Sequence, residues 1–130
     1  MVARSSLCFF CPVCRAETAA GTRVCPRCGA DTEAVQQRRD FVDKLIAALD
    51  HPEPETRARA ALILGLRGEA RGVEPLMRVV CRSDDASLVE AAIEALGRIG
   101  DPRCRKVIEA ALGRGTLRVR QAARHVLASF

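Results

Sequence analysis

The sequence predicts a mostly α-helical protein, an α-solenoid of about three two-helix units that follows a small N-terminal β-hairpin module. Two observations carry this prediction. Two closely spaced cysteine pairs lie between positions 11 and 28, and a pattern then recurs at intervals of 32 and 31 residues along the rest of the chain. Such a period is typical of stacked helical hairpins, because a single hairpin cannot bury its apolar stripe alone.

Composition suits one core with a small appended module. The chain has 130 residues, of which 48% are apolar. It contains no run of about 18 apolar residues, and its first residues, MVARSSLCFF, lack the apolar region and cleavage site of a secretory signal. We therefore expect a cytoplasmic protein without a membrane span. In that reducing compartment, closely spaced cysteines are metal ligands or redox groups rather than disulfides.

The two cysteine pairs have the spacing of a structural zinc site. Cys11 and Cys14 form the first pair, Cys25 and Cys28 form the second, and ten residues separate the pairs. A C-x2-C turn aims two thiolates at one point, and the intervening chain returns as a short hairpin. The sequence therefore predicts one structural Zn²⁺ held by these four cysteines, which supplies folding energy that so short a segment cannot obtain from a core.

The two turns differ in local chemistry. In CPRCG, Pro26 restricts φ and Gly29 can adopt the left-handed conformation, so that backbone N–H groups point at the sulfurs. In the first turn, Arg15 stands where a glycine is expected. The bases Arg15, Arg23 and Arg27 either help to keep the thiolates deprotonated or belong to the solvated surface.

Other interpretations of the cysteines fit the sequence less well. A thioredoxin-like redox site needs a C-x-x-C within a βαβ unit, and no such pattern surrounds these residues. A catalytic zinc keeps an open position and often uses histidine, but His51 and His125 lie far along the chain. A fifth cysteine, Cys8, lies in CFFC without a proline or a following glycine, and we take it as the spare. The alternative is that Cys8 replaces Cys11 or Cys14 as a ligand.

This segment resembles the zinc-ribbon family, in particular the short N-terminal ribbons of bacterial proteins that read CPxC, about ten residues, CPxCG. The resemblance covers about residues 9 to 32 and rests on CPVC and CPRCG. It implies a metal site and says almost nothing about function.

The remaining chain is expected to be helical. Residues 33 to 50 place apolar side chains at helical spacing, and Pro52 forbids continuation. Further helices are expected over 54–66, 72–82, 85–98, 103–113 and 116–129. The expected domains are a zinc ribbon over 1–32 and a solenoid over 33–130, with repeats at approximately 33–66, 72–98 and 103–129.

The repeat is visible in aligned positions. LGLRGEAR, which starts at Leu64, matches LGRIGDPR, which starts at Leu96. Large apolar residues align at Leu45, Met77 and Ile108, and alanines align at Ala60, Ala92 and Ala123. The small alanines let paired helices approach closely, and stacking the units creates one continuous core. Four glycines are expected to end helices and permit sharp turns, namely Gly65, Gly68, Gly97 and Gly100.

The stretches ETRARAALILG, SLVEAAIEALG and ALGRIGDPR resemble HEAT-like repeats, specifically the short bacterial class first described in phycobilisome lyases. The resemblance covers about residues 41 to 130 and implies an α-solenoid with the second helix of each pair on the concave side. The sequence departs from the pattern in two respects. Leu66 and Arg67 reverse the expected order, which leaves Leu62 and Leu66 as exposed apolar residues, and Val89 replaces the arginine found at Arg57 and Arg120.

No group of residues resembles an active site, so we expect a protein that is not an enzyme. Asp84 and Asp85 suit a helix N-cap, and Glu90 and Glu94 form an exposed i, i+4 pair. His51 and His125 have no expected partner. Cys81 aligns with core leucines, and Cys104 is expected to pack at a helix start or to be a reactive thiol. Lyase activity is not inherited, because the repeat is shared and the chemistry is not.

Binding is therefore the expected function, in one of two forms. In the first, the concave surface holds a protein partner, as a scaffold or adaptor does. The candidate contacts are Arg59, Leu62, Leu66, Glu94, Arg98, Gln121 and His125. In the alternative, the basic last repeat and the ribbon bind nucleic acid, since residues 103 to 130 carry seven bases and one acid. The candidate phosphate contacts are Arg103, Arg105, Lys106, Arg114, Arg118, Arg120 and Arg124.

Against nucleic acid, the chain has no Trp or Tyr to stack on bases. The last helix of a solenoid also needs a polar outer face, which these bases provide. The ribbon is expected to cover the N-terminal end of the repeat stack, the alternative being a free tether. The sequence does not identify the partner or the oligomeric state.

Overall fold

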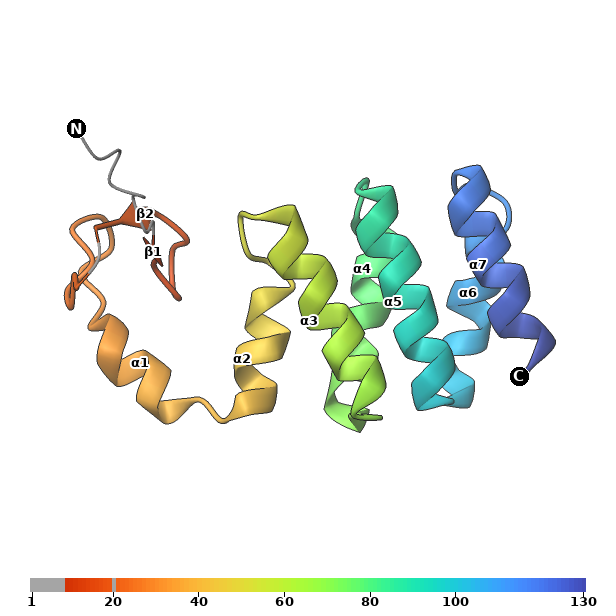
Figure 1. Ribbon diagram of the computed structural model, residues 1–130, viewed down its shortest axis with the longest axis horizontal. Helices are drawn as coiled ribbons and strands as arrows, with labels where there is room; N and C mark the ends of the chain where they lie inside the picture. The colour runs from red at the N-terminus through yellow and green to blue at the C-terminus, as the bar shows by residue number, and fades with distance from the viewer. Residues whose placement is uncertain (1–8, 20) are drawn as a thin grey trace, which may run out of the picture.

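The structure is a computed structural model that describes residues 9–19 and 21–130. A two-stranded antiparallel sheet, β1 (Phe9–Phe10) and β2 (Glu17–Thr18), pairs Phe9 with Thr18 and Phe10 with Glu17. Seven α-helices follow in the described part of the chain (Figure 1). They are α1 (Thr32–Arg38), α2 (Phe41–Ala48), α3 (Pro54–Leu66), α4 (Val73–Arg82), α5 (Ala86–Ile99), α6 (Arg105–Ala111) and α7 (Leu117–Ala128), with 3-10 turns η1 (Ala70–Gly72) and η2 (Pro102–Cys104) leading into α4 and α6.

The helices from α2 onward form two layers in a row of hairpins (Figure 1). In each hairpin the first helix packs on the second, as α2 does on α3, α4 on α5 and α6 on α7. Successive second helices also pack together, α3 on α5 and α5 on α7, so one core runs between the layers. The predicted fold class is therefore confirmed. The largest fully buried apolar side chains are Leu64, Val73, Leu76, Ile93, Leu96 and Ile108.

Capping residues fix where the helices begin. The Asp85 carboxylate accepts hydrogen bonds from the backbone N–H groups of Ser87 and Leu88 at 3.1 and 3.3 Å, which confirms it as the N-cap of α5. Thr116 caps α7 in the same way, through the N–H of Val119. Pro54 is the first residue of α3, where its missing N–H costs no helical bond.

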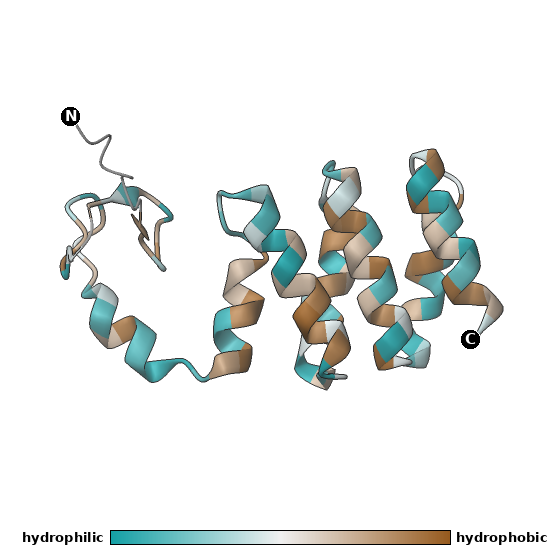
Figure 2. Ribbon diagram, in the orientation of Figure 1, coloured by the Kyte–Doolittle hydropathy of each residue, from teal (hydrophilic) through white to brown (hydrophobic). Residues whose placement is uncertain are grey.

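The prediction of one helix over 33–50 is wrong, because two helices occupy that stretch. Arg39 is extended, with φ −90° and ψ 130°, and the Asp40 carboxylate accepts a 2.8 Å hydrogen bond from the N–H of Asp43. An aspartate in this role starts a new helix instead of continuing the old one. All residues of α1 are at least partly exposed, and α1 is mostly hydrophilic (Figure 2). The first helix of the row of hairpins is therefore α2, which packs on α3.

The four glycines divide into two roles, of which only one was predicted. Gly68 and Gly100 lie at helix ends with φ of 61° and 74°, the left-handed conformation that glycine adopts without strain. Gly65 and Gly97 instead lie inside α3 and α5, so the prediction that they end helices is wrong. Gly65 of α3 faces α5, and Gly97 of α5 faces α7, at points where the two helices approach closely.

The two cysteines of the repeats have opposite environments. Cys104 is fully buried at the start of α6, as predicted for a packing residue. Cys81 is exposed, so its predicted place in the core is wrong. Its aligned residues, Leu49 and Leu112, are the C-caps of α2 and α6, whereas α4 continues to Arg82. Position 81 is thus within a helical turn, and its side chain points away from the core.

Candidate metal centre and partner-binding surface

The four predicted ligand cysteines lie together. The sulfurs of Cys11, Cys14, Cys25 and Cys28 all lie within 4.8 Å of one another. The Cys11 and Cys28 sulfurs are 3.6 Å apart, and those of Cys14 and Cys25 are 3.7 Å apart. A tetrahedral ion with metal–sulfur bonds of about 2.3 Å separates its sulfurs by about 3.8 Å. The donor set and its spacing therefore fit one four-coordinate metal ion.

The two cysteine turns have the same backbone hydrogen bonds. The Arg15 N–H donates to the Cys11 carbonyl at 3.0 Å, and the Gly29 N–H donates to the Cys25 carbonyl at 2.8 Å. Arg15 and Gly29 both have positive φ, 63° and 74°. Arg15 thus adopts the glycine conformation expected at its position, although it carries a side chain.

Electrostatics at the cluster favour a bound cation. Burial opposes ionisation of Cys11, but backbone hydrogen bonds, including that of the Val13 N–H, lower the pKa of its thiol to about 6. The backbone N–H of Cys28 similarly lowers the pKa of Cys25. At Cys28, the N–H of Ala30 favours the thiolate, but burial and the other three sulfurs outweigh it and raise the pKa to about 11. Four close thiolates need a positive ion to coexist.

Cys8 lies outside the described residues, so the prediction that it is the spare cysteine stays a prediction. The four remaining N-terminal cysteines complete a tetrahedral donor set without it. We refer to the described residues 9–19 and 21–31 as the cysteine module.

The cysteine module contacts the first repeat. The Arg15 guanidinium donates a hydrogen bond to the Ala47 carbonyl in the last turn of α2. The Phe10 ring meets the His51 ring edge-on, with centroids 4.8 Å apart and an interplanar angle of 82°. A cavity of about 290 Å³ lies between the module and the repeat. His51, which had no expected partner in the sequence, thus joins the two parts.

The surroundings of His51 favour its neutral form. Its Nδ1 accepts a hydrogen bond from the Glu53 N–H at 3.1 Å. Burial, together with the nearby positive charge of Arg15, lowers the pKa of His51. Sequence reasoning missed this contact because Phe10 and His51 are 41 positions apart and no local pattern pairs them.

All seven predicted partner contacts are exposed and belong to the second helices. We call this set, which comprises Arg59, Leu62, Leu66, Glu94, Arg98, Gln121 and His125, the second-helix face. Leu62 is 44% exposed and Leu66 is 60% exposed. Phe41 at the start of α2 is 52% exposed, and the Arg67 guanidinium lies 5.1 Å from its ring centroid. Phe41 therefore adds to the exposed apolar surface that Leu62 and Leu66 give the first repeat.

The predicted phosphate contacts do not form one free basic patch. Arg105 and Lys106 begin α6, whereas Arg114 follows its other end, and there Arg114 donates to the Val80 carbonyl at 3.3 Å. Arg120 is only partly exposed. Three of the bases form ion pairs, Arg103 with Asp101 and Glu74, Arg105 with Glu109, and Arg118 with Glu90. Lys106, Arg114 and Arg124 are exposed and have no carboxylate partner among the described residues, but Arg114 already donates to the Val80 carbonyl.

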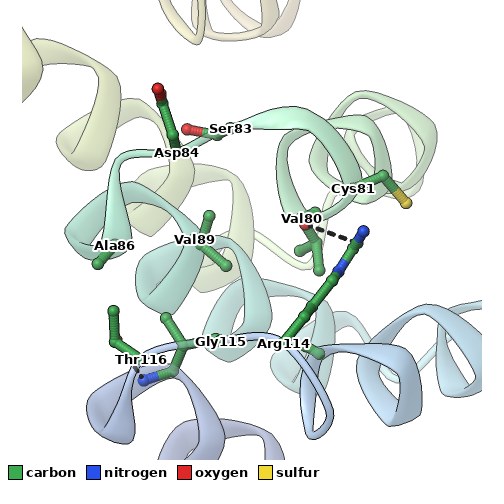
Figure 3. A pocket seen from close by; sticks show the side chains of 11 residues that line it. Val80, Cys81, Ser83, Asp84, Ala86, Val89, Arg114, Gly115 and Thr116 are labelled. Carbon is green, nitrogen blue, oxygen red and sulfur yellow. Dashed lines mark hydrogen bonds between the residues drawn. The ribbon is translucent and has the colours of Figure 1, made fainter.

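Two hollows lie between successive repeats. A cleft of about 200 Å³ lies between the turn that follows α4 and the turn that follows α6, and the Arg114 side chain crosses it to reach Val80 (Figure 3). Cys81 lines the same cleft. A larger groove of about 860 Å³ is lined by residues of α2 and α4, including Ile46 and Val79. Neither hollow brings together the residues of a recognisable active site among the described side chains.

None of the helices in the described part of the chain is long and apolar enough to cross a membrane. A search of curated protein sequences finds no match to this chain. The family described as HEAT repeats matches residues 42–128, which begin with α2 and end with α7. The phycobilisome-lyase class suggested by the sequence stays a prediction. The chain belongs to the HEAT repeat family.

Proposed function

We propose that the protein is a non-enzymatic scaffold or adaptor that holds a protein partner on the second-helix face and carries a structural Zn²⁺ in its cysteine module. Four thiolates at tetrahedral spacing are the ligand set of structural zinc sites, which keep no position open for substrate. HEAT-type arrays build extended surfaces from stacked helices, and such surfaces suit protein partners.

Leu62 and Leu66 carry the proposal for the partner surface. They lie one turn apart on α3 and are 44% and 60% exposed. The residues that align with Leu62 in the later repeats are Glu94 and His125, and those that align with Leu66 are Arg98 and Ser129. A pair of exposed leucines at positions that are polar elsewhere in the same array indicates an apolar contact, because each side chain that a partner covers adds favourable free energy.

An affinity capture from the source cell tests this surface. The wild-type chain is compared with Leu62→Ser/Leu66→Ser and with the control Leu117→Ser, since Leu117 is also 60% exposed but lies on α7. We expect a partner that the wild type and the control retain and the double variant loses, with unchanged helical content by circular dichroism. A partner captured equally by all three chains would place the interface elsewhere.

Nucleic-acid binding has weaker support, because ion pairs and backbone contacts already engage most of the basic side chains of the last repeat. Binding to phosphates depends steeply on salt, so it is most visible at low ionic strength. We expect no retardation of duplex or single-stranded DNA under that condition. Salt-dependent retardation that Lys106→Gln and Arg124→Gln weaken would instead support the nucleic-acid alternative.

A further inference from the structure

Arg15 occupies a backbone conformation that glycine would adopt more easily. Its φ is 63°, and the equivalent position of the second cysteine turn is Gly29 at 74°. A side chain in the left-handed region meets steric strain that glycine avoids. The first turn therefore carries a conformational cost, and the contacts of the Arg15 side chain offset it.

The Arg15 guanidinium reaches across to the repeats. It donates to the carbonyl of Ala47, which lies in the last turn of α2. The carbonyl end of a helix carries partial negative charge and favours a cation there. The side chain of Arg15 is partly buried in this position. Arg15 thus joins the metal-binding turn directly to the end of the first repeat helix.

Two further contacts dock the same turn. The Arg39 guanidinium donates to the Pro12 carbonyl at 3.5 Å, and Phe10 packs edge-on against His51. Phe10 precedes Cys11, Pro12 lies inside the turn, and Arg15 follows Cys14, so the contacts span the whole turn. Three residues of the second turn, Pro26, Arg27 and Cys28, are instead exposed. The docked turn and the exposed turn meet at the four sulfurs.

We propose that metal binding in the cysteine module and docking of the module onto α2 are thermodynamically coupled through Arg15. This inference goes beyond partner binding but rests on the proposed metal site. A bound ion fixes the first turn in the conformation from which Arg15 reaches Ala47, and a divalent ion with four thiolates leaves a net negative charge that attracts Arg15 and Arg39. Docking in turn favours the metal-bound turn, because coupling between two sites is reciprocal.

The consequence is a metal-dependent contact between the module and the repeats. When the metal leaves, the first turn loses its fixed geometry, Arg15 releases Ala47, and the end of α2 loses a stabilising contact. The cysteine module then becomes a tether in front of the array. Depletion of metal would thereby change the shape of the protein that a partner meets.

Hydrogen exchange on the full chain tests the coupling. Exchange of the α2 amides is compared between zinc-saturated protein and protein treated with a chelator under reducing conditions, for the wild type, Arg15→Gly and Arg27→Gln. Glycine suits the left-handed conformation at position 15 and removes only the side-chain contact. Arg27→Gln is the control, because it removes a charge beside the cysteines at an exposed position of the second turn.

We expect chelation to speed exchange in α2 by at least about fivefold in the wild type and the control, the lower range of coupling between sites. Arg15→Gly should still hold one zinc at saturation but show the faster exchange with or without metal. Arg39→Gln should also show faster exchange of the α2 amides in the metal-bound state, but by a smaller factor. Protection of α2 in Arg15→Gly that still depends on metal, or exchange in the wild type that chelation does not change, would each overturn the coupling. A wild type that binds no zinc would refute the metal site itself, and the coupling with it.

Discussion

Gly65 of α3 packs so closely on Ala95 of α5 that a Cβ at position 65 would lie 2.6 Å from the Ala95 Cα. The next pair of second helices repeats this relationship, because a Cβ on Gly97 of α5 would lie 2.8 Å from the Val126 methyl groups of α7. Because glycine has no side chain, it allows the close approach of α3 to α5 and of α5 to α7. The aligned residue of α7 is Ala128, which is exposed.

Gly65→Ala should destabilise the array. The nearest atoms to the added methyl group belong to the Ala95 backbone, so α3 and α5 must move apart. Overpacking of this kind costs about 1–3 kcal/mol, measured as a lower midpoint of chemical unfolding. Gly113→Ala is the control, because the added Cβ would meet only the Ala110 carbonyl oxygen at 3.7 Å. Equal stability of both variants would contradict the close approach.

Asp85→Ala should weaken the start of α5. The carboxylate caps two backbone N–H groups and also lies 3.3 Å from the Arg57 guanidinium of the preceding repeat. Loss of an N-cap costs about 1–2 kcal/mol, and faster hydrogen exchange in the first turn of α5 would locate the effect. The neighbouring Asp84 is exposed and does not cap the helix, so Asp84→Ala should leave stability nearly unchanged.

The chain should bind one zinc ion. Cys25→Ser removes a buried sulfur from the cluster and should lose the metal, as measured by elemental analysis after gel filtration. Cys81→Ser is the matched control, because Cys81 is exposed and remote from the cluster. Cys8→Ser should also retain zinc. Zinc retained by Cys25→Ser, or lost from Cys8→Ser, would overturn the ligand assignment.

The two repeat cysteines should differ in reactivity. Burial raises the pKa of Cys104, and its side chain is fully covered, so the native protein should protect it from alkylation. Cys81 is exposed and should react readily. Peptide mapping of metal-loaded protein after brief alkylation distinguishes them. Rapid labelling of Cys104 in the folded chain would show that the start of α6 opens.

Asp101 should contribute stability that disappears in acid. The hydrogen bond from the Arg103 side chain, followed by that from its backbone N–H, lowers the pKa of Asp101 below its ordinary value of 3.8. Because the folded pKa is the lower one, the contribution is full above 3.8 and is lost as pH falls through the folded value. Asp101→Asn keeps the capping geometry without the charge. The stability difference between wild type and variant should therefore shrink in acid, and a difference independent of pH would contradict the assignment.

Local patterns in the sequence were sufficient for the helical hairpins and for the position of most helices. The pattern over 33–50 failed at one point, because helical spacing continues across Asp40 although its carboxylate caps a new helix. The alignment of Cys81 with core leucines failed because α4 continues past the position at which α2 and α6 end. In both cases the deciding factor was where a helix begins or ends, which depends on single hydrogen bonds.

Periodicity and short spacing were enough to predict the repeated hairpins, the clustering of four cysteines and the exposure of Leu62 and Leu66. The close contacts at Gly65 and Gly97, and the contacts by which Arg15 and His51 join the cysteine module to the repeats, are visible only in the folded chain. These contacts link residues 29 to 41 positions apart. No local pattern encodes them, since they exist only once the helices have stacked.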